Sequence, residues 1–150
     1  MGYTHYWTIN QKEISPESWF GFMQEFSEIE AKFHNKLEHK EYGLSSEYLT
    51  FNGIGEQGHE TFSMNRKNPM EKSHTGNMEY FNFCKTARKE YDIAVCCALI
   101  IAKKYFGDII KVSSDGQDQD GWDKAKELCQ ETLKYGSNFN ISYENGGVFT

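Results

Sequence analysis

The sequence lacks an excess of positive charge. Its 150 residues include 16 Lys and Arg against 22 Asp and Glu, which gives a formal net charge of −6 at pH 7. Proteins that bind DNA or RNA regardless of sequence usually present a basic surface that displaces counterions from the phosphates. The charge balance therefore argues against general nucleic-acid binding, and it leaves room for a small anionic ligand at a local basic patch.

Long apolar runs, targeting signals and paired cysteine motifs are also absent. No stretch reaches the ~18 consecutive apolar residues of a membrane-spanning helix, and the opening MGYTHYWTIN has neither the basic nor the apolar region of a secretory signal. The four cysteines, Cys84, Cys96, Cys97 and Cys129, show no C-x-x-C spacing. We expect a soluble cytoplasmic protein with reduced thiols and no membrane contact.

The hydrophobic pattern predicts one domain over residues 1–150, long enough to bury a core without disulfides or a structural metal. Periodicity predicts a strand over 3–9, a long helix over 15–43, strands over 47–54, 59–65 and 78–84, a buried helix over 92–107, a strand and turn over 108–116, a third helix over 122–136 and a weak strand in the tail. This order is typical of the α+β class. We expect a small, mostly antiparallel sheet packed with one long amphipathic helix and two further helices.

Terminal signals support the two longest predicted helices. Ser15 and Pro16 are typical of a helix N-cap and first position, and Gly43 of a helix end. Asp92 is a plausible N-cap for the buried helix, and Gly107 follows it as an end signal.

Positive charge gathers in one region of this acidic chain. Residues 61–90 hold six Lys or Arg and three Glu. Just before the buried helix lie three of these cations and one hydroxyl side chain, namely Lys85, Thr86, Arg88 and Lys89. The unpaired N–H groups at the start of a helix also favour anions. Arg can grip a phosphate or carboxylate with two parallel hydrogen bonds. We predict an anion-binding site there; the alternative is an ordinary solvated loop.

Two other segments supply candidate ligand contacts. The glycine-rich FNGIGEQGHETF does not follow a Walker or dinucleotide-binding spacing, but it places Asn52, His59 and Thr61 in one loop. In the first strand, alternation puts His5 and Trp7 on one face, where Trp7 could stack on a base while His5 donates a hydrogen bond. The alternatives are a purely structural turn for the loop and burial under the long helix for His5 and Trp7.

No complete catalytic or metal-binding motif is present. The H-x-T pattern at His59 occurs once, and a two-histidine phosphoesterase needs two copies. The segment from Gly116 to Glu127 imitates a calcium loop with Asp118 and Asp120, but it begins with glycine instead of aspartate. We therefore predict no metal and no cofactor, and we assign no catalytic residue. Cys84, beside Lys85, is a candidate for a lowered thiol pKa.

Several motifs together carry a resemblance: GYTHYW at the start, FNG and HETF in the middle, then FCKTARKEYD and SSDG. With these motifs, most of the chain resembles a group of small uncharacterised proteins encoded by bacteriophages. The resemblance implies a phage protein made in the cytoplasm of a bacterial host, and it implies no catalytic residue. The group has no established activity, but phages use other small α+β proteins of this size as sponges for nucleotide-derived immune signals, as hydrolases of such signals or as inhibitors of host proteins.

Local cations, aromatic side chains and polar loops favour the sponge, in which the partner is an anionic, nucleotide-derived small molecule that the protein sequesters. The first alternative is a hydrolase with His5 and His59 as acid and base and with Lys85 and Arg88 stabilising phosphoryl charge. The second alternative is an inhibitor that binds a host protein through an acidic surface. The oligomeric state stays open, with a homo-oligomer among the options.

Overall fold

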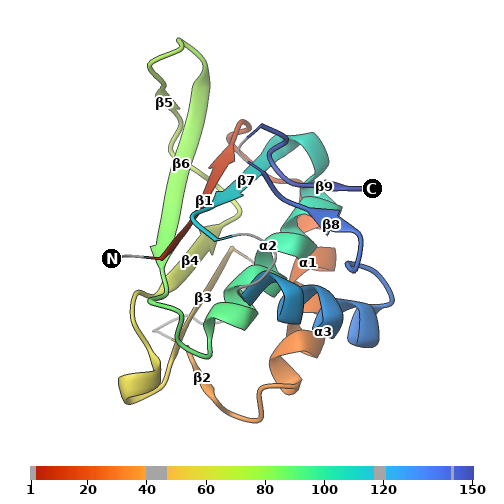
Figure 1. The fold of residues 1–150 in the computed structure, drawn as a ribbon. Coiled ribbons are helices and arrows are strands. Elements are labelled where there is room, and N and C mark those ends of the chain that lie inside the picture. Colours follow the sequence, from red (N-terminus) through yellow and green to blue (C-terminus); the bar gives the residue numbers. More distant parts are fainter. Residues whose placement is uncertain (1–2, 40–46, 117–120, 143) are drawn as a thin grey trace.

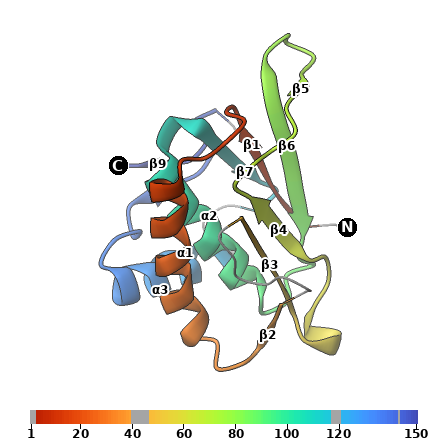
Figure 2. The same cartoon turned by 180° about the vertical axis from the view of Figure 1, so that it is seen from behind.

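A central helix, α2 (Asp92–Phe106), lies between a four-stranded sheet and two further helices, α1 (Pro16–Ala31) and α3 (Asp123–Leu133) (Figures 1 and 2). This arrangement comes from a computed structural model that describes residues 3–39, 47–116, 121–142 and 144–150. Three helices and antiparallel sheets place the chain in the α+β class, as the sequence predicts. In the described chain no helix is both long and apolar enough to cross a membrane.

Within the described residues, the strands form three antiparallel sheets. The four-stranded sheet has the order β5 (Glu71–Lys72), β6 (Met78–Lys85), β1 (Thr4–Ile9) and β7 (Ile110–Ser114). A second sheet contains β2 (Leu37–Glu38), β3 (Tyr48–Gly53) and β4 (Phe62–Asn65), and the tail forms the hairpin β8 (Phe139–Asn140) and β9 (Val148–Phe149). Short 3-10 turns cover Gly55–Gln57 and Gly107–Ile109.

Strand β1 has the alternation that its sequence predicts. His5, Trp7 and Ile9 point to the helical side and are buried, whereas Tyr6 and Thr8 point to the opposite face and stay half-buried. Both neighbours pair with β1 in register, with Tyr6 opposite Phe83 on β6 and Ser113 on β7. In Figures 1 and 2 the helices lie on one side of this sheet, and no described helix covers its other face.

Ring contacts connect the second sheet to the rest of the core. The ring centroids of Phe26 and Phe51 lie 5.0 Å apart, those of Phe51 and Phe62 5.0 Å, and those of Phe62 and Trp7 5.1 Å. This chain of contacts runs from α1 through β3 and β4 to β1. Aromatic pairs at such distances contribute beyond the apolar area they bury, so the two sheets share one core.

The long helix is shorter than predicted. It ends at Ala31, because His34 and Asn35 adopt left-handed backbone angles, with φ of 48° and 67°, and turn the chain back. Leu37 then pairs with Gly53 to form β2. Phe33 and Leu37 are buried, but a turn and a strand place them there instead of a helix. The predicted end signal Gly43 lies outside the described residues.

Candidate functional site

The cationic segment, residues 85–89, begins at the last residue of β6 and forms a tight loop that leads to α2; we call it the basic loop. Its Thr86 backbone N–H donates to the Tyr3 carbonyl over 3.1 Å, and the Lys89 N–H donates to the Thr86 carbonyl over 3.1 Å. Ala87 and Arg88 have left-handed backbone angles, with φ of 52° and 58°. Such angles are unfavourable for residues other than glycine and persist where surrounding contacts fix them. The loop therefore has a fixed shape.

A second loop, built around Asn52, lies against the basic loop. The Asn52 side-chain oxygen accepts hydrogen bonds from the Gly53 and His59 backbone N–H groups, at 2.8 and 3.0 Å. Its amide nitrogen donates to the His59 carbonyl and to the Thr61 hydroxyl, at 3.0 and 3.2 Å. Asn52 is nearly buried and uses both ends of its amide to hold the loop, so we assign it a structural role.

The two loops are joined through Lys85 and its neighbours. The Lys85 N–H donates to the Glu60 carboxylate over 2.9 Å, and the Glu60 N–H donates to the Lys85 carbonyl over 3.1 Å. The same carbonyl accepts a 2.8 Å bond from His59 Nδ1, and the Tyr91 hydroxyl donates to the Glu60 and Lys85 carbonyls. His59 therefore lies beside Lys85, with its Nδ1 engaged and its ring exposed.

Four of the predicted anion contacts remain accessible. His59, Lys85 and Arg88 are exposed and Lys89 is half-buried. The Arg88 guanidinium carbon lies 4.2 Å from the centre of the Tyr3 ring, a cation–π contact that holds this side chain in place. The geometry thus brings cations from one loop and a histidine from another to a common surface.

The start of α2 does not offer a free dipole to an external anion. Asp92, the first helical residue, already places a carboxylate there, and Tyr91 occupies the cap position without a capping hydrogen bond from its side chain. Asp92 is therefore not the predicted N-cap: its Oδ1 accepts bonds of 2.6 Å from His5 Nε2 and 2.6 Å from the Thr86 hydroxyl. An internal carboxylate satisfies the positive end of the helix dipole in this protein.

His5, Asp92, Thr86, Ser114 and Trp122 form a network of buried polar groups, which we call the His5 network. Ser114 Oγ accepts bonds from Trp122 Nε1 at 3.2 Å and from the Gly116 N–H at 3.1 Å. Because both lone pairs are used, the Ser114 hydroxyl must donate its own proton over 2.7 Å to His5 Nδ1. His5 then carries its proton on Nε2 and donates it to Asp92.

This proton arrangement limits the chemistry of the network. The ligand atoms of His5, Asp92 and Cys96 lie within 4.8 Å of one another, as a metal site would require. However, both His5 nitrogens are already engaged, Nδ1 by Ser114 and Nε2 by Asp92, so a metal would have to displace the hydrogen bond to Asp92. The Ser114 oxygen has no lone pair left for nucleophilic attack. The network therefore joins β1, β7, α2 and the basic loop as a structural unit.

The remaining predicted contacts lie inside the protein. Trp7 is 1% exposed and packs on Phe62, and its indole N–H has no hydrogen-bond partner among the described residues. His5 and Thr86 are fully buried in the His5 network. Direct contact with a ligand, which the sequence suggested for these three side chains, is blocked because all three are buried: His5 and Trp7 lie on the covered face of the sheet, and the Thr86 side chain points inwards to Asp92.

A second surface was missed from the sequence: a row of rings on the uncovered face of the sheet, formed by Tyr6, Phe81 and Phe83, which we call the aromatic row. The Tyr6 and Phe81 rings are stacked with centroids 6.1 Å apart, and Phe81 and Phe83 are also 6.1 Å apart. Lys85 Nζ lies 5.8 Å from the Phe83 ring centre. The alternation of the predicted strand over 78–84, which puts Phe81 and Phe83 on one face, was the available signal.

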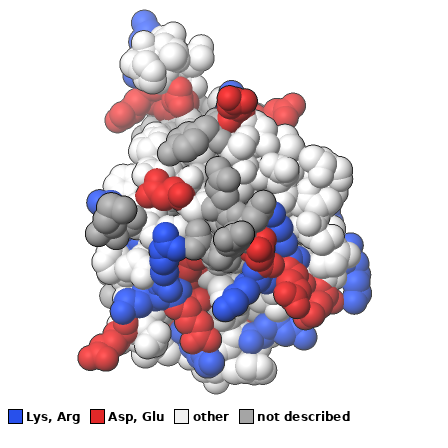
Figure 3. All heavy atoms as spheres, viewed as in Figure 1, with Lys and Arg blue, Asp and Glu red and all other residues white. Residues whose placement is uncertain are grey.

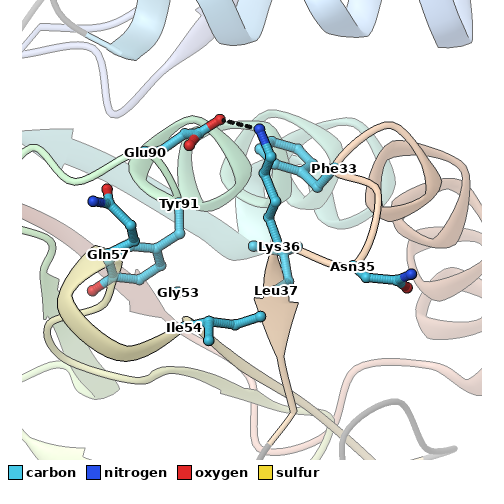
Figure 4. A pocket seen from close by; sticks show the side chains of 9 residues that line it. All are labelled: Phe33, Asn35, Lys36, Leu37, Gly53, Ile54, Gln57, Glu90 and Tyr91. Atoms are coloured by element: carbon cyan, nitrogen blue, oxygen red, sulfur yellow. Dashed lines mark hydrogen bonds and ion pairs between the residues drawn. The ribbon is translucent and has the colours of Figure 1, made fainter.

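A hollow of about 220 Å³ is lined by Tyr91 and by residues of the α1–β2 and β3–β4 connections (Figure 4). Phe33, Leu37 and Ile54 supply apolar walls, and Lys36 meets Glu90 at its rim with a distance of 3.2 Å between Nζ and Oε1. Ligand pockets typically measure ~300–1,000 Å³, so this hollow is small for a nucleotide. It also contains none of the cations of the basic loop.

Cys84 differs from its sequence-based prediction. Its thiol is buried and points towards the Glu60 carbonyl at 3.5 Å. Burial raises the pKa of Cys84 to about 12, and the nearby acidic groups Glu60 and Asp92 add to the rise. The ammonium group of Lys85 does not offset the burial, because Lys85 lies on the opposite face of β6. The thiol is therefore unreactive at neutral pH.

Charges on the face shown in Figure 3 are mixed. Lys and Arg lie side by side with Asp and Glu across the lower half of the view, so the described surface there has no field of a single sign. The candidate calcium ligands Asp118 and Asp120 lie outside the described residues. No protein family, curated protein or solved structure matches the chain.

Proposed function

We propose that the protein binds an anionic, nucleotide-derived small molecule and sequesters it without converting it. The observation that carries the proposal is the position of Lys85. Its side chain lies over Phe83 at the end of the aromatic row, and its backbone connects that row to the basic loop and His59. A planar base on the rings and a phosphate at the cations would both be within reach of one ligand.

Sequestration accounts for the geometry better than hydrolysis. The hydrolase alternative requires His5 and His59 to exchange protons with the substrate. His5 is enclosed and bonded at both nitrogens, and no hydrogen bond or ring contact in the described part of the chain joins it to His59. In the phage setting implied by the sequence resemblance, holding a host immune signal intact would lower its free concentration.

The decisive experiment recovers the ligand. The protein is incubated with cyclic dinucleotides and cyclic ADP-ribose isomers, separated from free compound and denatured, and the released small molecules are analysed. Recovery of an intact compound in stoichiometric amount supports sequestration. Recovery of a converted compound supports a hydrolase instead, and a protein that retains none of the panel contradicts the proposal.

A charge variant locates the site. Lys85→Ala combined with Arg88→Ala is expected to leave the melting temperature nearly unchanged and to abolish calorimetric binding of the retained compound, because both side chains are exposed. The matched control, Lys12→Ala with Lys124→Ala, removes the same charge from exposed positions elsewhere. Equal losses in both variants would show a general charge effect and would contradict a site at the basic loop.

A further inference from the structure

We propose that the aromatic row is a stacking platform for more than one base, so that the ligand class is a short single-stranded oligonucleotide, linear or cyclic. This inference rests on the proposed function and adds the number of bases to it. It depends on the face of the sheet that the helices leave uncovered, and on the chemistry of the side chains across β6, β1 and β7.

Strand register arranges these side chains as a grid. Phe81 lies opposite Thr8, which lies opposite Lys111; Phe83 lies opposite Tyr6, which lies opposite Ser113. All of them point away from the helices, because the alternate residues of each strand are buried on the other side. The face therefore combines aromatic rings with small hydroxyl side chains that leave the rings accessible.

The rings are exposed to an unusual degree for their size. Phe81 is 56% exposed and Phe83 is 42% exposed, although β6 pairs with β1 at both positions. Tyr6 is fixed beside them, since its hydroxyl donates to the Asp115 carboxylate over 3.0 Å. Adjacent exposed rings on one sheet face are a typical stacking surface for unpaired bases.

The length of the row indicates several bases. Its three rings are separated by two steps of 6.1 Å, whereas one base covers a single ring. A mononucleotide would therefore leave at least one exposed ring without a partner. A strand of two or three nucleotides can place bases on neighbouring rings.

Cations at two corners of the grid suit the phosphates of such a strand. Lys85 follows Phe83 along β6, and Lys111 lies across the sheet from Phe81; both are exposed. The basic loop continues from the Lys85 corner. A duplex hides the faces of its bases and depends on many phosphate contacts, so two lysines on an acidic protein favour a short single strand over a duplex.

The test measures how binding depends on ligand length. Dye-labelled hexathymidylate is the probe for fluorescence anisotropy, and thymidine mono-, di- and trinucleotides, a cyclic dinucleotide and a duplex are the competitors. Each added nucleotide, up to three, is expected to improve competition about 5- to 150-fold, as stacking of one base does. The slope of log affinity against log salt is expected to be roughly −1.4 for two phosphate contacts; a slope near zero contradicts the lysine contacts.

Phe81→Ser with Phe83→Ser is expected to weaken hexathymidylate binding at least 25-fold, while thermal melting shows that the fold is kept. The control is Phe20→Ser, which removes a 67% exposed ring from α1 and is expected to leave binding unchanged. Light scattering of the same proteins reports their mass. A dimer that dissociates in the double variant would show that a second copy covers this face, and would overturn the inference.

The outcomes separate this inference from the proposed function. If a mononucleotide competes as well as a trinucleotide and the double Phe variant binds normally, the multi-base platform is wrong while anion binding at the basic loop stands. If hexathymidylate and every competitor fail to bind, and the signal compounds are not retained either, both proposals are wrong. Preferential binding of the duplex would also overturn the platform.

Discussion

Thr86→Val tests whether the His5 network holds the basic loop. Thr86 is fully buried, and its hydroxyl donates to Asp92 Oδ1 over 2.6 Å. Valine has nearly the same shape and is more apolar, so a core that depended on apolar burial alone would be stabilised by the change. The network predicts the opposite sign.

The magnitude follows from the two opposing effects. Losing a hydrogen bond to a charged group costs about 1.5–3 kcal/mol, and burying one more methyl group in place of the hydroxyl contributes about 0.8 kcal/mol. The net loss in the free energy of unfolding is about 1–2 kcal/mol. For a chain of this length, this corresponds to a fall of about 2–8 °C in melting temperature.

Urea unfolding followed by tryptophan fluorescence measures the change. The matched control is Thr8→Val, on the open face of the sheet, where no hydrogen bond to the side chain occurs among the described residues. Thr8→Val is expected to change the free energy of unfolding by less than about 0.5 kcal/mol. A Thr86→Val protein as stable as the wild type would refute the assignment of the network as structural.

Three further predictions concern single side chains. Truncating the buried Trp7 to Ala should lower the free energy of unfolding by about 3–5 kcal/mol, and ligand affinity per folded molecule should stay unchanged; a loss of affinity at full folding would contradict the core position. Cys84, whose pKa burial raises to about 12, should not react with a thiol reagent at pH 8 until urea is added, and fast native labelling would contradict this. Arg66 lowers the pKa of Glu47 through a hydrogen bond, so the pair stabilises the fold above the unfolded pKa of Glu47 and loses this contribution as pH falls through the folded value. Glu47→Gln should therefore flatten the acid limb of the stability curve, and superimposable curves for the two proteins would argue against the pair.

The longer strands and α2 were predictable because their signals are local. The alternation of His5, Trp7 and Ile9 and the continuous apolar run of α2 require only neighbouring residues. The end of α1 was not predictable in this way. Phe33 and Leu37 keep helical spacing, but the pairing of Leu37 with Gly53, sixteen positions further on, turns the chain out of the helix. Pairing between segments overrides the local period.

Some residues of the candidate site could likewise be predicted from local signals, and others depend on contacts distant in sequence. Charge counting along the chain was enough to find Lys85, Arg88 and Lys89. Alternation showed that His5 and Trp7 share a face, but it could not show that helices cover that face. The hydrogen-bond partners of the buried His5 are Asp92 and Ser114, which lie 87 and 109 residues away in the sequence. To predict the aromatic row, one would also need to know the three-dimensional packing, namely that no described helix covers Phe81 and Phe83.

The His5 network also bears on how the proposed site works. Thr86 belongs to the basic loop, yet its hydroxyl is used inside, on Asp92, where it helps to hold two neighbouring residues at left-handed angles. The loop is thus fixed from beneath, and the cations that flank Thr86 stay on the outside. A loop that is ordered before binding loses less entropy when it takes up a ligand. A change at Asp92 should therefore weaken binding by loosening the loop, although this carboxylate never meets the ligand, whereas changes at Lys85 or Phe83 should act on the ligand itself.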